Sequence, residues 1–201
     1  SSTPVPNANN RILKYPAANL ATGGAATVVL GQSSLTNLDW NQHVSEKFFH
    51  APQDIAIDST GNVWISEHNN HRVVKFDTSN QKFGGAATVV LGQTDFTSDG
   101  LGNTATTLRH PNGIEFDSSG NLWVVDRGSN RILQYPAANL VTGGAATVAL
   151  GQADLTSRVT GNTATTLDTP HSIEFDSSGN LWVGDRVNNR LLMFPAANLV
   201  T

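Results

Sequence analysis

Short apolar runs that alternate with polar residues recur along the chain, and turn-forming residues separate them. In "GIEFDSSGNLWVVD" (113–126), two such runs flank the segment 117–121. Asp, Ser, Gly and Asn adopt tight-turn dihedrals and bond to their own backbone, so this pattern predicts a β-hairpin. A third strand is predicted at "RILQY" (131–135) and a fourth at "ATVALGQ" (146–152). No stretch has a helical period long enough to predict a helix of any length.

The same four-strand unit returns along the chain. The segment "NNRILKYPAANLATGGAATVVLGQ" (9–32) returns as "SNRILQYPAANLVTGGAATVALGQ" (129–152), and altered copies lie between them and at the C-terminal end. The arginines that mark the repeat are Arg11, Arg72, Arg131 and Arg190. Four antiparallel strands per repeat of about 60 residues indicate an all-β fold, a β-propeller with four-stranded blades.

The repeats divide the chain into one array of about three blades. The predicted segments are a partial blade at 9–32, blades at 52–93 and 111–152, and a partial blade at 170–194. An open array exposes unpaired strand edges and apolar blade faces. Two explanations stay open: the chain is a piece of a longer array, or a second copy joins it through the chain ends. In the second case, a homodimer completes a six-bladed ring.

Composition excludes several classes of partner and site. The 201 residues carry a formal net charge of -4, without a run of lysine or arginine that could cover a phosphate backbone, so no nucleic-acid partner is expected. No window is apolar enough to cross a membrane. The absence of cysteine excludes disulfides and thiolate metal sites. The N-terminus lacks a signal-peptide pattern, which is compatible with a mature secreted or cell-surface form, and the compartment stays open.

One motif recurs in a fixed order, as in "TPHSIEFDSSGNLWVGDRVNNR" (169–190). It consists of a proline, an apolar strand ending in Asp, a Gly-Asn turn, a second apolar strand ending in an acidic residue, and Asn-x-Arg. This order resembles the NHL repeat. The resemblance implies a β-propeller, commonly six-bladed, and no single activity, because the family includes binding modules, scaffolds and enzymes.

Polar residues at two positions differ from blade to blade. After the proline stand Gln53, Asn112 and His171, and after the second strand of each hairpin stand Glu67 and His68, Asp126 and Arg127, and Asp185 and Arg186. In a propeller both sets are expected at one mouth of the central channel. Variable polar groups on a regular scaffold favour a module that binds a small molecule, peptide or protein there.

An enzyme is the alternative function. The blade with His171 and Arg186 resembles one blade of peptidyl-α-hydroxyglycine α-amidating lyase, and the resemblance implies a zinc-binding role for the histidine and a catalytic role for the arginine. A zinc site needs at least three converging protein ligands, but Gln53 and Asn112 occupy the positions equivalent to His171. We therefore predict no metal, no cofactor and no catalytic residue, and a lyase or hydrolase that uses channel residues remains the second hypothesis.

The other charged and histidine residues are predicted to be structural. The four marker arginines suit hydrogen bonds between blades, and Glu115 and Glu174, which lie between apolar neighbours on their strands, are the carboxylates expected to pair with them. The spacing of His43, His50, His68 and His110 matches no metal-ligand pattern.

Overall fold

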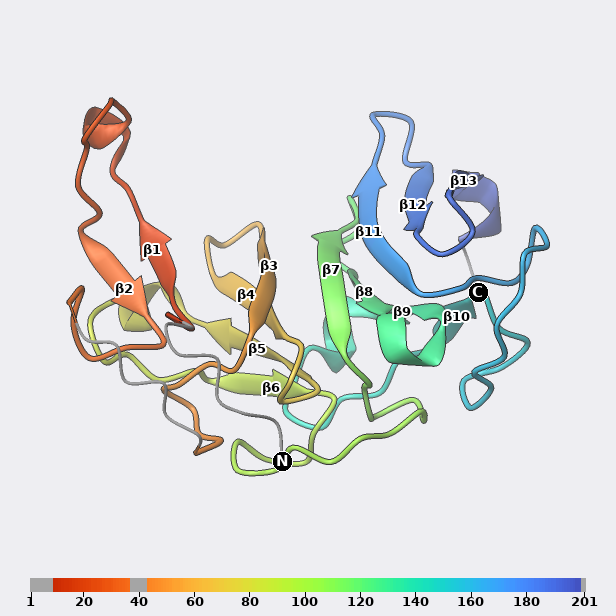
Figure 1. Cartoon of the computed structure of the whole chain (residues 1–201), viewed down its shortest axis with the longest axis horizontal. Coiled ribbons are helices and arrows are strands. Elements are labelled where there is room, and N and C mark those ends of the chain that lie inside the picture. Colours follow the sequence, from red (N-terminus) through yellow and green to blue (C-terminus); the bar gives the residue numbers. More distant parts are fainter. Residues whose placement is uncertain (1–8, 37–42, 200–201) are drawn as a thin grey trace.

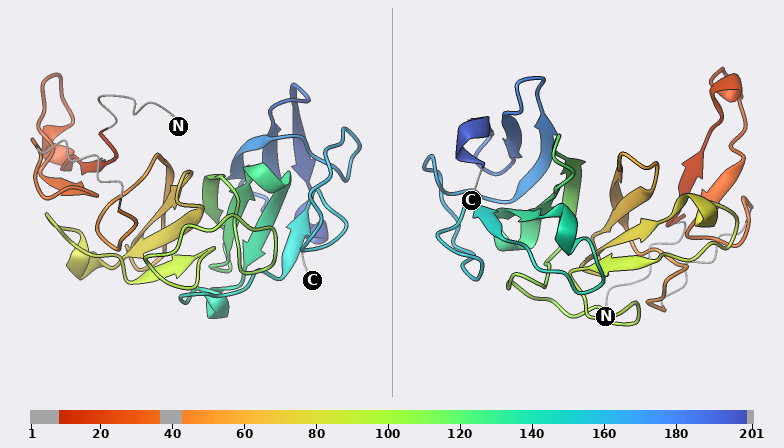
Figure 2. Two further views of the ribbon diagram at one scale, coloured as in Figure 1. Left: turned by 60° about the horizontal axis from the view of Figure 1, so that its bottom comes forward. Right: turned by 180° about the vertical axis from the view of Figure 1, so that it is seen from behind.

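The computed structural model describes residues 9–36 and 43–199, and the strands in these ranges form four antiparallel sheets. The sheets, here called blades 1 to 4 in chain order, follow one another along an open arc (Figures 1 and 2). The described part of the chain is thus an all-β partial propeller of about three blades, which confirms the predicted fold class. Within the same ranges, no helix is long and apolar enough to cross a membrane.

The strands run outward from the inner side of the arc in each complete blade. Blade 1 contains β1 (Ile12–Lys14) and β2 (Val28–Leu30). Blade 2 contains β3 (Pro52–Ile57), β4 (Val63–Glu67), β5 (Arg72–Phe76) and β6 (Val89–Leu91). Blade 3 contains β7 (Pro111–Phe116), β8 (Leu122–Asp126), β9 (Arg131–Tyr135) and β10 (Val148–Leu150). Blade 4 contains β11 (Pro170–Phe175), β12 (Leu181–Asp185) and β13 (Arg190–Phe194). Short 3-10 turns join them: η1 (Ala17–Asn19), η2 (Thr78–Asn80), η3 (Arg127–Ser129), η4 (Ala137–Asn139) and η5 (Ala196–Asn198).

In blades 2, 3 and 4, an aspartate side chain holds the turn between the first two strands. In blade 3 the amides of Ser119 and Asn121 donate to Asp117 Oδ1, each over 2.9 Å. The indole Nε1 of Trp123 donates to the other carboxylate oxygen of Asp117, over 3.0 Å. The equivalent pairs are Asp58 with Trp64 and Asp176 with Trp182. The turn sequence therefore fixes the backbone and also orients the tryptophan on the second strand.

These tryptophans form the contacts between blades. Trp64 packs edge-on against Phe116 of the next blade, and Trp123 packs in the same way against Phe175, with ring centroids 6.0 Å apart in both pairs. Both indoles are buried, whereas Trp182 on the last blade is 42% exposed. Edge-to-face aromatic pairs are favourable beyond their buried area, so the repeated tryptophan holds each blade to the one that follows.

The inner strands β3, β7 and β11 lie next to each other on the inner side of the arc (Figure 1). Their approach is close, because a Cβ atom on Gly113 of blade 3 would lie 3.1 Å from Ser172 Cα of blade 4, which is tighter than an ordinary contact. A side-chain bond also crosses this gap between blades 2 and 3, where the amide of Ile114 donates to Asp54 Oδ2 over 2.9 Å. The first residues of these neighbouring strands therefore follow one another along the same edge of the inner side.

Candidate functional site

The acidic residues that end β4, β8 and β12 are Glu67, Asp126 and Asp185, and all three side chains are fully buried. Each accepts a hydrogen bond from the Nε atom of an arginine that opens the following strand, over 2.7 Å. These arginines are Arg72, Arg131 and Arg190. Each carboxylate is thus held in an ion pair within its own blade, and of the three only Asp185 also lines the hollow on blade 4 described below.

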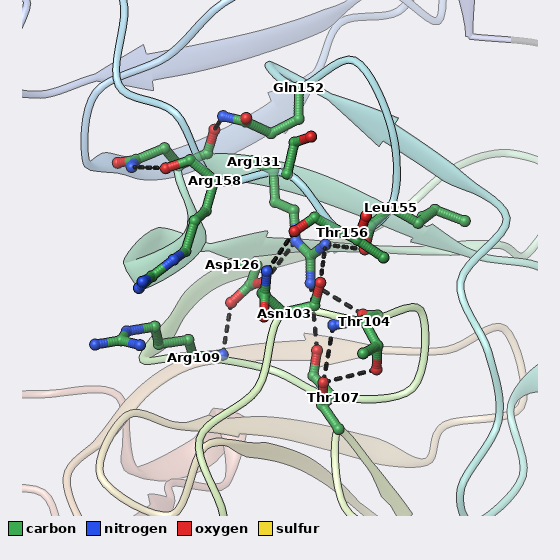
Figure 3. A network of polar contacts seen from close by, with 12 residues as sticks. Asn103, Thr104, Thr107, Arg109, Asp126, Arg131, Gln152, Leu155, Thr156 and Arg158 are labelled. Atoms are coloured by element: carbon green, nitrogen blue, oxygen red, sulfur yellow. Dashed lines mark hydrogen bonds and ion pairs between the residues drawn. The ribbon is translucent and has the colours of Figure 1, made fainter.

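The arginine of each pair joins loops that are distant in the sequence, as Figure 3 shows for Arg131. Its Nη1 atom donates to the carbonyl oxygens of Leu155 and Asn103, and its Nη2 atom donates to the carbonyl of Thr104. The other oxygen of Asp126 accepts the Arg109 amide over 2.7 Å. A buried guanidinium with all these acceptors is a structural centre, as predicted for the marker arginines.

The prediction that Glu115 and Glu174 pair with these arginines is wrong. Glu115 lies opposite Trp123 in the register of β7 and β8, whereas the arginine pairs form at the far end of β8, where Asp126 lies opposite Arg131. Glu115 instead accepts the amide of Phe116 over 3.2 Å, and Glu174 is exposed.

Burial raises the pKa of two carboxylates in this region, and the groups that oppose this rise differ between them. Burial raises the pKa of Asp126 to about 6, against the lowering effect of Arg131. Burial also raises the pKa of Glu115, and the nearby carboxylates of Glu174 and Asp54 add to the rise. Asp126 keeps a guanidinium partner that compensates its burial, while Glu115 has only a backbone amide.

Three of the predicted mouth residues share a common backbone feature. Gln53, Asn112 and His171 lie at register shifts near the starts of β3, β7 and β11. An extra residue at such a bulge turns its side chain away from the regular ladder, and bulges are common beside active sites and binding sites. The Gln53 and His171 side chains are exposed, whereas that of Asn112 is buried.

The structure brings His68, Asn112 and Arg127 together. The Nδ1 atom of His68 lies 3.0 Å from Asn112 Oδ1, a bond that connects blades 2 and 3. Arg127 follows β8 directly, and its charge contributes to lowering the pKa of His68, after burial and the neighbouring His110.

The remaining mouth residues lie apart from this group. His171 and Arg186 line one hollow of about 350 Å³ on blade 4, together with Ser172, Gly184 and the ion pair of Asp185 and Arg190. Gln53 donates from Nε2 to the carbonyl oxygen of Ala51, a local bond of 3.2 Å.

Sequence reasoning missed His71 as a member of the site. His110 stacks on His68 with ring centroids 4.6 Å apart, and it meets His71 edge-on at 4.5 Å. The His71 Nδ1 atom accepts the amide of His110 over 3.2 Å. At the next junction the Asn130 Oδ1 atom accepts the amide of Thr169 in the same way. Alignment of the repeats places His71 where the others carry asparagine, and this substitution was the signal for its role.

Both His71 and His110 adopt a left-handed backbone, with φ of 53° in each case. Asparagine tolerates this region better than most residues, so histidine at position 71 is an uncommon choice. The equivalent residues Asn130 and Thr169 have φ of 56° and 54°, so this backbone conformation belongs to the repeat.

The three histidines share a lowered pKa. Burial is the main cause in each, and it lowers the pKa of His71 to about 4, with further lowering from His110 and His68. For His110, the charges of Arg109 and Arg127 add to the effect of burial. The rings are therefore neutral near pH 7, in a region with excess positive charge. In the described ranges, no group of three or more acidic or histidine side chains is placed to hold a metal ion.

The fold and repeated motif define the class of this molecule as a partial β-propeller. Residues 49–76 and 108–135 match the model of the NHL repeat. These two segments are therefore NHL repeats, in agreement with the resemblance found in the sequence.

Solved structures share the fold. A streptogramin B lyase is 15% identical, with a TM-score of 0.50 over 80% of this chain and 41% of its own. A gluconolactonase from Xanthomonas campestris is 12% identical, with a TM-score of 0.53 over 96% of this chain and 55% of its own. The chain thus spans only part of each relative, and at these identities the likeness concerns the fold alone. A search of curated proteins found no significant match.

Proposed function

We propose that the chain is a binding module that recognises a small molecule, a peptide or a protein at the channel mouth. One observation carries the proposal: an ion pair of a carboxylate and an arginine closes the second strand in each of blades 2 to 4, while the next residue is a histidine in blade 2 and an arginine in blades 3 and 4. That residue is His68, Arg127 or Arg186. A constant scaffold that presents different polar side chains in neighbouring blades is a common basis for ligand recognition.

The proposed contact residues are the mouth side chains that the scaffold leaves accessible. They are Gln53, His68, Arg127, His171 and Arg186, each of which is exposed or half-buried. Asn112 is buried and holds the His68 ring through Oδ1, so it orients a contact residue instead of contacting the ligand itself.

A melting-temperature screen tests this function. Ligands that bind only the native state raise the melting temperature. We expect compounds or peptides that stabilise the wild type but fail to stabilise a triple variant with Gln53→Ala, His68→Ala and Arg127→Ala. The function would be refuted if no tested compound stabilised the wild type, or if every stabilising compound acted equally on the triple variant.

An enzyme of lyase or hydrolase type is the second candidate, because His171 and Arg186 line the same hollow. Incubation of each stabilising compound with the protein, followed by mass spectrometry, separates the two functions. Binding without conversion supports the module. Conversion lost in both His171→Ala and Arg186→Ala would favour the enzyme. For the binding module we expect elemental analysis of the purified protein to find no stoichiometric zinc.

We further propose that a second copy of the chain covers the two open ends of the arc. At the first end blade 1 has only two strands, and Ile55 and Ile57 of blade 2, which line a hollow beside β1 and β2, are 42% and 64% exposed. Their equivalents Ile114 and Phe116 lie within the apolar contact between blades 2 and 3. At the other end Trp182 and Leu191 are exposed, although the equivalent residues Trp123 and Ile132 are buried.

The two open faces are complementary because each repeats one half of an existing contact. Within the chain, the tryptophan face of one blade packs on the first strand of the next. The Trp182 face of one copy therefore matches the Ile57 face of another, and two such contacts complete a closed, two-fold ring.

Light scattering tests this assembly. We expect a dimer that Trp182→Lys or Ile57→Lys converts to monomer, whereas Lys82→Gln at an exposed loop leaves it intact. A cooperatively folded wild-type monomer at micromolar concentration would contradict the proposal.

A further inference from the structure

We propose that the hollow beside His68, His110 and Arg127 binds an oxyanion, that is, a carboxylate or phosphate group. The inference rests on the proposed binding function, because it names the chemical class recognised at the same mouth. The hollow has a volume of about 340 Å³, and its lining extends from blade 2 to the loop before blade 4. The lining residues are His68, His110, Arg127, Gly128, Asn130, Thr160 and Thr169, and none of them carries a carboxylate.

Arg127 is the cationic anchor of this proposed site. Its Nε atom is buried and has no hydrogen-bond partner within the described ranges. An unsatisfied buried donor costs free energy, and a ligand that accepts its proton would remove that cost. Guanidinium groups bind carboxylates and phosphates through two parallel hydrogen bonds, so an oxyanion is the ligand group that fits best.

The two histidine rings are already oriented beside the anchor. His68 Nδ1 faces the Asn112 Oδ1 atom, and His110 Nδ1 lies 3.3 Å from the carbonyl oxygen of His68. A carbonyl oxygen only accepts, so the Nδ1 atom of each ring carries the proton. A proton taken up by either ring would turn that ring into a charged donor toward an oxyanion.

The surrounding charges favour a negative ligand. The charges of Arg109 and Arg127 both act on His110. Two carboxylates lie nearby: the charge of Asp99 raises the pKa of His71, and Asp168 accepts the Thr169 hydroxyl over 2.9 Å. The carboxylates of Glu67 and Asp126 are enclosed in their arginine pairs. The net charge around the hollow is therefore positive, and no lining residue carries a carboxylate that could pair with Arg127.

Proton uptake gives the site a pH dependence. The lowered pKa values of His68 and His110 show that burial and the neighbouring cations disfavour their charged forms. A bound oxyanion opposes the cationic repulsion and raises both pKa values, so binding and protonation reinforce each other. Because both pKa values lie below the ordinary histidine value of about 6.5, the affinity for an oxyanion is expected to increase as the pH falls through and below that value.

Nuclear magnetic resonance of the histidine rings tests the site directly. Inorganic phosphate and acetate serve as probes and distinguish a phosphate from a carboxylate preference. We expect at least one of them to shift the ring signals of His68 and His110 and to raise their pKa values. In Arg127→Gln the affinity should fall about tenfold or more, since a hydrogen bond to a charged group is lost. Lys82→Gln removes the same charge at an exposed position and should behave as wild type.

Two results would overturn the inference. One is the absence of any shift at His68 and His110 with either probe, and the other is an equal response in Arg127→Gln and wild type. If either result were accompanied by a neutral compound that depends on Gln53 but not on Arg127 in the melting screen, the oxyanion site would fail and the binding function would stand. The proposed binding function is refuted only if no compound stabilises the protein in a way that depends on the mouth residues.

Discussion

The junction of blades 2 and 3 and the junction of blades 3 and 4 share one scaffold but differ in chemistry. Both contain a tryptophan packed on the next blade's phenylalanine at 6.0 Å and a buried ion pair of 2.7 Å. The first carries a stack of three histidines, His68, His71 and His110. At the second, the equivalent positions are occupied by Arg127, Asn130 and Thr169.

This difference teaches which positions hold the fold and which remain free to vary. Where His71 replaces asparagine, its Nδ1 atom takes over the same hydrogen bond to the following loop. His68 and Arg127, by contrast, are not needed for the ion pair that precedes them. The ion pair and the bond to the following loop are therefore the same at both junctions, whereas the residue at the mouth differs in charge.

The largest expected effect concerns the buried ion pairs. Arg72→Ala and Arg131→Ala should each lower the free energy of unfolding by about 3 to 5 kcal/mol, because each leaves a buried carboxylate without its partner. Chemical denaturation measures both values. Similar losses would support one scaffold for the two junctions, and a loss confined to one of them would break the comparison.

The tryptophan contacts come next. Trp64→Phe and Trp123→Phe should each cost about 1 to 3 kcal/mol, since each leaves an aspartate in the hairpin turn without the indole donor. Trp182→Phe removes the equivalent bond at an exposed position, so a smaller loss is expected in the monomer. Equal losses for Trp123 and Trp182 would contradict the role assigned to packing between blades.

Acid sensitivity should distinguish the two junctions. Burial lowers the pKa of folded His71 to about 4, so the unfolded chain binds the proton first as the pH falls. The stability linked to His71 is therefore complete above the unfolded pKa of about 6.5 and is lost as the pH falls toward 4. Melting temperatures recorded across this range should decline less in His71→Asn than in wild type.

A transplant sharpens the same comparison. Asn130→His places the histidine at the second junction, where its ring can accept the Thr169 amide as His71 accepts that of His110. We expect this variant to lose more stability than wild type between pH 6.5 and 4. An unchanged pH dependence in both variants would show that His71 is not responsible.

The smallest expected effect is that of Arg127 on stability. Its guanidinium makes no hydrogen bond within the described ranges, so Arg127→Ala should change the free energy of unfolding by no more than about 0.5 kcal/mol. Denaturation under the conditions used for Arg131→Ala provides the measurement. A loss comparable to that of Arg131→Ala would place Arg127 in the scaffold.

The sequence predicted the fold more completely than the site. Alternating runs, the aspartate turn and the repeated arginine were enough for the blades, because each acts within one repeat. The prediction of the carboxylate that pairs with each arginine was wrong because Glu115 and Asp126 lie on neighbouring strands. Only the strand register shows that Asp126 lies opposite Arg131. The histidine stack joins residues from two blades, so its geometry depended on how the blades pack.

The central claim is that scaffold and mouth are separate, and one paired measurement tests it most directly. Melting temperatures of Arg131→Lys and Arg127→Gln are compared with wild type, with and without inorganic phosphate. The account predicts that Arg131→Lys melts at a lower temperature yet keeps the stabilisation by phosphate. It predicts that Arg127→Gln melts as wild type does and loses that stabilisation. If Arg127→Gln instead lowered the melting temperature and still responded to phosphate, the division between scaffold and mouth would be contradicted.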